Sequence, residues 1–160
     1  MAAPIPYPIL AVLRRCHELE LLMGKVYSEL ATKHAAHARV SALWAKTAAE
    51  EGNHASQFTL ALSLSGDVVS SAKVELAQVD GAIASANTFL RQVRGGVVQV
   101  DDALRRAIEL EEQMAAFHLH VAVAFASSAH EKLFRAMMAA DKGHISALRG
   151  ELDRLSGRRP

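Results

Sequence analysis

The chain has 160 residues, of which 51% are hydrophobic and 22% are charged, and its net charge at pH 7 is +1. This balance excludes an intrinsically disordered chain and a strongly basic nucleic-acid-binding protein. Because Cys16 is the only cysteine, a disulfide framework and a zinc site made of several cysteines are excluded as well. The length predicts a single domain over residues 1–160.

Hydrophobic segments give no sign of a membrane protein. No apolar run approaches the ~20 residues that a membrane-spanning helix requires. The first ten residues carry no basic segment followed by an apolar one, so we expect no signal peptide. The sequence therefore predicts a cytoplasmic protein without membrane or nucleic-acid partners.

The positions of the prolines favour an all-α fold. Prolines occupy positions 4, 6, 8 and 160 only, and the chain between them is rich in alanine, leucine, glutamate and arginine. Such a segment can form long helices. Apolar residues recur every three or four positions, as in the series Ile9, Val12, Cys16, Leu19 and Met23, which is typical of one face of a helix.

Start and stop signals divide this pattern into four long helices, over about residues 9–35, 38–65, 102–126 and 128–155. The first two and the last two each predict an antiparallel hairpin. Between the hairpins, residues 66–100 form a long crossover that contains a short amphipathic helix ending at Gly95. The predicted fold is a four-helix bundle of two helix hairpins joined by one long crossover.

The two predicted hairpins carry a repeated motif. Glu51 and His54 form a Glu-x-x-His sequence in the second helix, and Asp141 and His144 form Asp-x-x-His about 90 residues later. Residues three apart share a helical face, so each pair can ligate one metal ion. Each preceding helix adds a glutamate on its apolar side, and these two residues are Glu20 and Glu111.

In this doubled motif the chain resembles the ferritin-like superfamily, most closely the rubrerythrin-type di-iron domains. Tyr27 follows Glu20 by seven residues, as in those families. The resemblance implies a ferritin-like bundle that binds two iron ions, with manganese or zinc as the other compatible metals. It implies six ligands, which are Glu20, Glu51, His54, Glu111, Asp141 and His144.

Two positions and one missing domain depart from the family pattern. Asp141 is one methylene shorter than the expected glutamate, and Met114 stands where rubrerythrins carry a further glutamate. The chain also lacks the four metal-binding cysteines of a rubredoxin-like domain. Because of these differences, a peroxidase of the rubrerythrin type is less well supported than the fold.

Neighbouring polar residues leave alternatives open. Tyr27 and the equivalent His118 are each either a residue that orients a metal ligand or a core residue with a satisfied polar tip. Glu50, next to Glu51, is expected to be solvated.

The expected function is that of a non-haem di-iron oxidoreductase of the ferroxidase or peroxide-reducing type, with dioxygen or hydrogen peroxide as oxidant. One alternative is a non-catalytic metal-binding or structural bundle. Another is a di-iron hydroxylase of an organic substrate. Symmetry favours a homodimer or a larger homo-oligomer.

Overall fold

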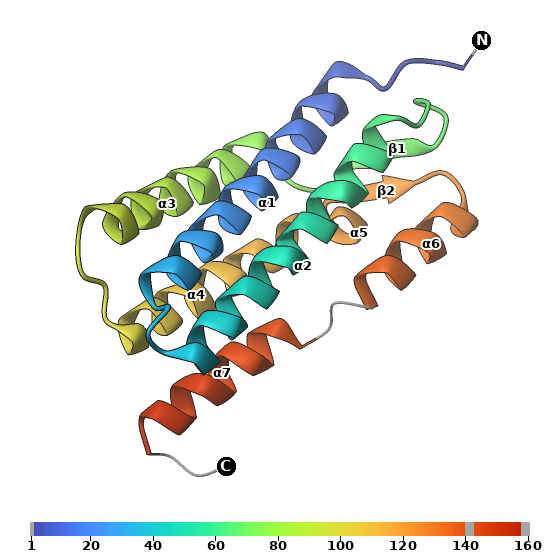
Figure 1. Cartoon of the computed structure of the whole chain (residues 1–160). Coiled ribbons are helices and arrows are strands. Elements are labelled where there is room, and N and C mark those ends of the chain that lie inside the picture. The colour runs from blue at the N-terminus through green and yellow to red at the C-terminus, as the bar shows by residue number, and fades with distance from the viewer. Residues whose placement is uncertain (1, 140–142, 158–160) are drawn as a thin grey trace.

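The computed structural model describes residues 2–139 and 143–157 and consists mainly of helices (Figure 1). This confirms the all-α class, to which the structure adds one short two-stranded sheet. In chain order the elements are α1 (Tyr7–Lys33), α2 (Ala38–Leu62), β1 (Val69–Ala72), α3 (Leu76–Gly95), α4 (Val100–Met114), the 3-10 helix η1 (Ala115–Phe117), α5 (Leu119–Ala122), β2 (Val123–Phe125), α6 (Ser128–Ala139) and α7 (His144–Leu155).

The first predicted hairpin is confirmed by α1 and α2, which run antiparallel beside each other (Figure 1). Helix α1 begins at Tyr7, two residues earlier than expected, because Pro8 lies in the first turn, where a missing N–H breaks no helical hydrogen bond. Helix α2 ends at Leu62, three residues early. After it, Gly66 passes so close to Pro4 that a Cβ would lie 2.3 Å from the Pro4 carbonyl oxygen.

The crossover contains α3, which is longer than the short helix that the sequence predicted. Its 20 residues begin after a capping box in which Glu75 and Gln78 bond to each other's backbone, and they end at Gly95 as expected. Helix α3 packs against α1 on the side away from α2 (Figure 1).

The prediction of one helix over residues 102–126 is wrong beyond Met114. There α4 gives way to η1, α5 and the strand β2. Strand β2 pairs antiparallel with β1, with Val69 opposite Phe125 and Ala72 opposite Val123. This pairing provides hydrogen bonds for the backbone of β2, where a continuous helix would have formed its own.

The fourth predicted helix, over residues 128–155, is also interrupted. Gly143 has a φ of 103°, a left-handed conformation that favours glycine, and α7 starts directly after it at His144. Helices α6 and α7 therefore replace one continuous helix. Asp141 lies outside the described residues.

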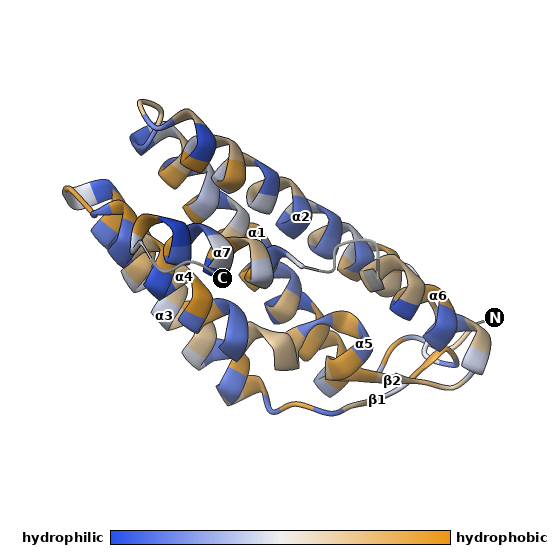
Figure 2. Cartoon of the chain, turned by 90° about the horizontal axis from the view of Figure 1, so that it is seen from below, coloured by the Kyte–Doolittle hydropathy of each residue, from blue (hydrophilic) through white to orange (hydrophobic). Residues whose placement is uncertain are grey.

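Helix α1 lies at the centre of the packing. It contacts both α2 and α3, while α4 packs against α7 and α3. Hydrophobic residues cover β2 and the inward sides of the helices, and hydrophilic residues lie mainly outside (Figure 2). Within the core, the rings of Tyr27 and Trp44 stack 5.5 Å apart. Among the described residues, none of the helices combines the length and the apolar character needed to cross a bilayer.

Candidate metal centre

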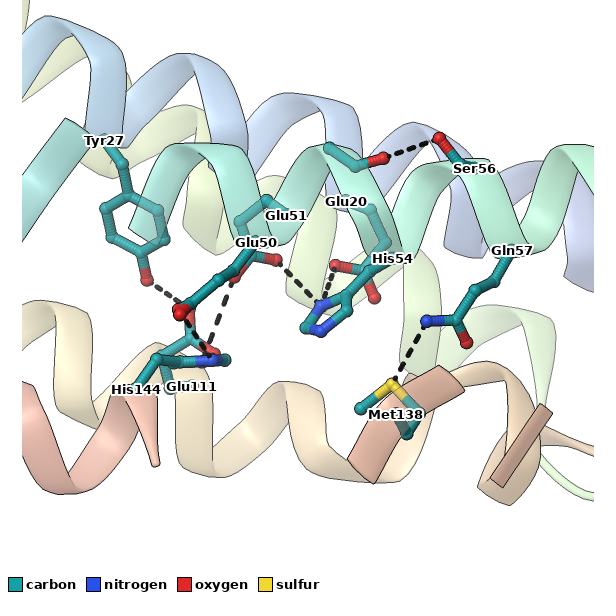
Figure 3. Close-up of polar contacts among 11 residues, drawn as sticks. Glu20, Tyr27, Glu50, Glu51, His54, Ser56, Gln57, Glu111, Met138 and His144 are labelled. Atoms are coloured by element: carbon teal, nitrogen blue, oxygen red, sulfur yellow. Dashed lines mark hydrogen bonds and ion pairs between the residues drawn. The ribbon is translucent and has the colours of Figure 1, made fainter. Parts of the chain in front are cut away.

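Carboxylate and imidazole side chains converge inside this helical core (Figure 3). Five of the six predicted ligands come together there from α1, α2, α4 and α7. They are Glu20, Glu51, His54, Glu111 and His144, and each is at most 7% exposed. The sixth predicted ligand, Asp141, lies outside the described residues, so its role stays a prediction.

The first cluster consists of Glu20, His54 and His118, whose potential ligand atoms all lie within 4.8 Å of one another. Glu20 Oε2 is 3.4 Å from His54 Nδ1, and the rings of His54 and His118 have their centroids 4.9 Å apart. His118 reaches the cluster from the extended residue between η1 and α5.

The second cluster consists of Glu51, Glu111 and His144, which meet the same 4.8 Å limit. His144 Nε2 lies 2.7 Å from Glu111 Oε2 and 3.9 Å from Glu51 Oε1. His144 is the first residue of α7, so Gly143 directly before it sets the direction from which this imidazole enters the core.

Glu51 connects the two clusters. Its Oε2 is 3.5 Å from His54 Nδ1 in the first cluster, while its Oε1 faces His144 in the second. Among the described residues, the two carboxylate oxygens of Glu51 have no hydrogen-bond partner of ordinary geometry, and Glu20 Oε2 has none either. A carboxylate with both oxygens unsatisfied between two ligand sets can bridge two cations.

The buried carboxylates are costly to ionise without a metal. Burial raises the pKa of Glu20 to about 8, and the charge of Glu111 adds to this. Burial also raises the pKa of Glu51 well above its usual range, again with a contribution from Glu111. At pH 7 Glu20 therefore holds a proton in the metal-free protein, because burial disfavours its charged form.

The histidines differ in charge. Burial lowers the pKa of His144, but the hydrogen bond and charge of Glu111 more than offset this, and the pKa reaches about 9. Burial lowers the pKa of His118 to about 4, with the nearby His54 adding to the effect. His118 is thus neutral at pH 7, which is the form of imidazole that binds a metal.

Tyr27 donates a hydrogen bond to Glu111 Oε1. Burial raises the pKa of Glu111, but hydrogen bonds from His144 and Tyr27 hold it below the ordinary value. Of the two alternatives left open for Tyr27, this contact supports the one in which the phenol orients a metal ligand.

Two residues depart from the expectations. Glu50, expected to be solvated, is 8% exposed, and its Oε2 lies 3.5 Å from His144 Nδ1. The start of α7 covers Glu50 on α2, and the periodicity of α2 alone cannot predict this contact. His118, with a role that the sequence left undecided, belongs to the first cluster. In the sequence it stands out only through its equivalence to Tyr27 in the repeat.

Helix α7 is tied to the start of α2 by a buried carboxylate. Glu151 is 4% exposed and accepts hydrogen bonds from Arg39 and Arg154. Hydrogen bonds from Arg154 in particular hold the pKa of Glu151 below its usual range. This contact fixes the helix that carries His144 against the first hairpin.

The two Glu/His clusters are able to hold metal ions. Their donor set is carboxylate and imidazole only, which suits iron, manganese and zinc in proteins. The unsatisfied oxygens of Glu20 and Glu51 fit a cation and fit a purely structural core poorly. No protein-family model, no curated protein and no solved structure matches this chain.

Proposed function

We propose that this protein is a non-haem di-iron carboxylate protein that oxidises Fe(II) with dioxygen or peroxide. The observation that carries the proposal is the pair of adjacent clusters, in which Glu51 faces both. Clustered carboxylates in a core are expensive unless cations neutralise them, so the arrangement has a physical reason only with metal bound.

The proposed fold is a variant of the ferritin-like four-helix bundle. Helices α1 and α2 form one hairpin, and α4 with the interrupted pair α6 and α7 forms the other. Interruption of the second hairpin distinguishes the chain from a regular bundle. The di-metal sites of such bundles use inward-facing glutamates and Glu-x-x-His motifs, as Glu51 and His54 provide here.

The protein residues have separate tasks in this proposal. Glu20 and Glu111 would each hold one ion, Glu51 would serve both, and His54 and His144 would complete the two ligand sets. A pair of Fe(II) ions bound there would supply two electrons, enough to reduce dioxygen to hydrogen peroxide or hydrogen peroxide to water. Tyr27 holds Glu111 in place, and the surrounding apolar side chains exclude bulk water.

Iron is favoured over manganese and zinc because the two clusters together combine imidazoles with several carboxylates. Imidazole suits iron and zinc, whereas carboxylates stabilise the ferric state that oxidation produces. Zinc at the same place would give a structural site without redox chemistry, which is the competing function.

The test is anaerobic loading of the full chain with two equivalents of Fe(II), followed by addition of oxygenated buffer. We expect oxygen consumption together with a rise in near-ultraviolet absorbance from ferric iron. Glu51→Gln should abolish both signals, whereas Glu109→Gln, on the exposed side of α4, should retain them. Tight metal binding without oxygen consumption would instead identify a structural site.

A further inference from the structure

The interruption after α4 places an additional histidine in the metal centre. Helix α4 ends at Met114, and His118 then takes an extended conformation with φ −61° and ψ 143°. Its carbonyl oxygen accepts hydrogen bonds from the N–H groups of Val121 and Ala122, the last two residues of α5. The backbone at His118 is therefore fixed against α5.

The side chain of His118 has no other evident task. It is 8% exposed, and its Nε2 has no hydrogen-bond partner among the described residues. Burying an imidazole nitrogen without a partner costs free energy that a metal ion would recover. Glu20 Oε2, in the same cluster, is unsatisfied in the same way.

The two clusters differ in their ligands. The first offers two imidazoles and one carboxylate, from His54, His118 and Glu20, whereas the second offers two carboxylates and one imidazole. Two imidazoles with one carboxylate and open coordination positions are typical of mononuclear Fe(II) sites. A divalent ion in the first cluster would keep a formal charge of +1, and one in the second would be neutralised.

We propose that Glu20, His54 and His118 form a two-histidine, one-carboxylate site that takes a single Fe(II) or Co(II) ion before the second cluster fills and leaves positions open for an exogenous diatomic ligand. This inference rests on the proposed function and makes its two metal positions unequal. In the second cluster the ligand atoms of Glu111 and His144 are hydrogen-bonded to each other, and this contact must break before an ion enters. In the first cluster Glu20 Oε2 and His118 Nε2 have no hydrogen-bond partner among the described residues, so the first cluster fills earlier.

The test is an anaerobic titration of the full chain with Co(II), whose visible absorbance reports the ligands of each ion. We expect two phases in the natural sequence. His118→Ala should weaken the first phase about 100-fold or more, since it removes a ligand, while the second phase remains. Glu111→Gln should do the opposite and weaken only the second phase.

His120→Ala is the matched control. This histidine lies two residues further on, with its ring stacked 6.3 Å from that of His118, and belongs to neither cluster. It should leave both phases unchanged. His118→Gln fills most of the imidazole volume, so it separates loss of the ligand from loss of packing and should also weaken the first phase.

A second readout uses one equivalent of Fe(II) and nitric oxide. Open positions in the first cluster should give the electron paramagnetic resonance signal of a mononuclear iron nitrosyl, which His118→Ala should remove and His120→Ala should retain. Two Co(II) sites of equal affinity, both unaffected by His118→Ala, would overturn this inference and leave the proposed function standing. If the natural chain bound no Co(II) or Fe(II), both would fail.

Discussion

Tyr27 on α1 donates a hydrogen bond to the Glu111 carboxylate on α4, and this buried contact joins the two halves of the chain at the candidate metal centre. The same carboxylate accepts a second hydrogen bond from His144 on α7. One carboxylate thus holds three helices in register through groups that lie in or beside the second cluster.

Tyr27→Phe should keep the stacking on Trp44 and remove only the donor to Glu111. Leaving a buried carboxylate with one hydrogen bond fewer should cost about 1–3 kcal/mol of stability. Metal affinity of the second cluster should fall about tenfold, because a ligand loses the group that orients it. Denaturant unfolding and a Co(II) titration measure the two effects. Tyr7→Phe, at a residue that is 78% exposed, is the control and should change neither.

Glu51→Gln should stabilise the metal-free protein and weaken metal binding. Burial and the charges of Glu111 and Glu20 make ionisation of Glu51 unfavourable, and a neutral amide of equal size removes that cost. A gain of about 1 kcal/mol corresponds to a rise of roughly 2–4 °C in melting temperature for a domain of this size. Calorimetry in the presence of a chelator checks this, with Glu109→Gln as the exposed control. A lower melting temperature for Glu51→Gln would contradict the prediction.

The metal-free protein should lose stability as the pH rises from 6.5 to 8. The pKa of Glu20 is about 8 in the folded protein against an ordinary 4.5, so the folded state resists the ionisation that the unfolded chain undergoes freely. His144 acts in the same direction, because its pKa of about 9 exceeds the ordinary 6.5 and the folded state retains its proton. His118, with a pKa lowered to about 4, opposes this only below pH 6.5.

Urea unfolding at several pH values between 6.5 and 8, with a chelator present, measures this dependence. Glu20→Gln should make it shallower, since the group at position 20 no longer titrates. A midpoint that stays constant or rises over this range would show that Glu20 and His144 do not hold protons as described.

Metal binding at pH 7 should release protons. Glu20 and His144 both hold a proton at that pH, and each must lose it before its ligand atom can bind a cation. We expect about two protons or more per chain on loading with two equivalents of Co(II), because the pKa of Glu51 is raised as well, and an indicator dye in weak buffer measures the release. His118→Gln should not lower the release caused by the second ion, because His118 is already neutral. Release of less than one proton in total would contradict the assignment.

Much of the first cluster and of the second could be predicted because it depends on local spacing. Glu51 and His54 share a helical face whatever the rest of the chain does, and the position of the turn between α1 and α2 brings Glu20 to the same level. The place of Glu111 follows from its position in the repeat. These residues lie in regular helices, where sequence periodicity is a reliable guide.

The surroundings of His118 could not be predicted in this way. Residues 97–142 contain no glycine or proline, so no local signal marks the end of α4 at Met114. The helical preference of the residues in β2 is overridden by their pairing with β1, a strand far away in the sequence. Gly143, by contrast, lies inside the helix predicted over residues 128–155, and only its left-handed conformation in the structure explains why α7 starts at His144.

The pairing of β1 with β2 has a consequence for the order of events during folding. Val69 and Phe125 are separated by roughly 55 residues, so the ladder forms only after a long loop has closed. Glu20 and His54 are synthesised early and can pack within their own hairpin, but His118 takes its place only once the ribbon has formed. Under the proposed function, the nascent first half of the chain thus lacks part of the ligand set, and tight binding of a cation requires the complete fold.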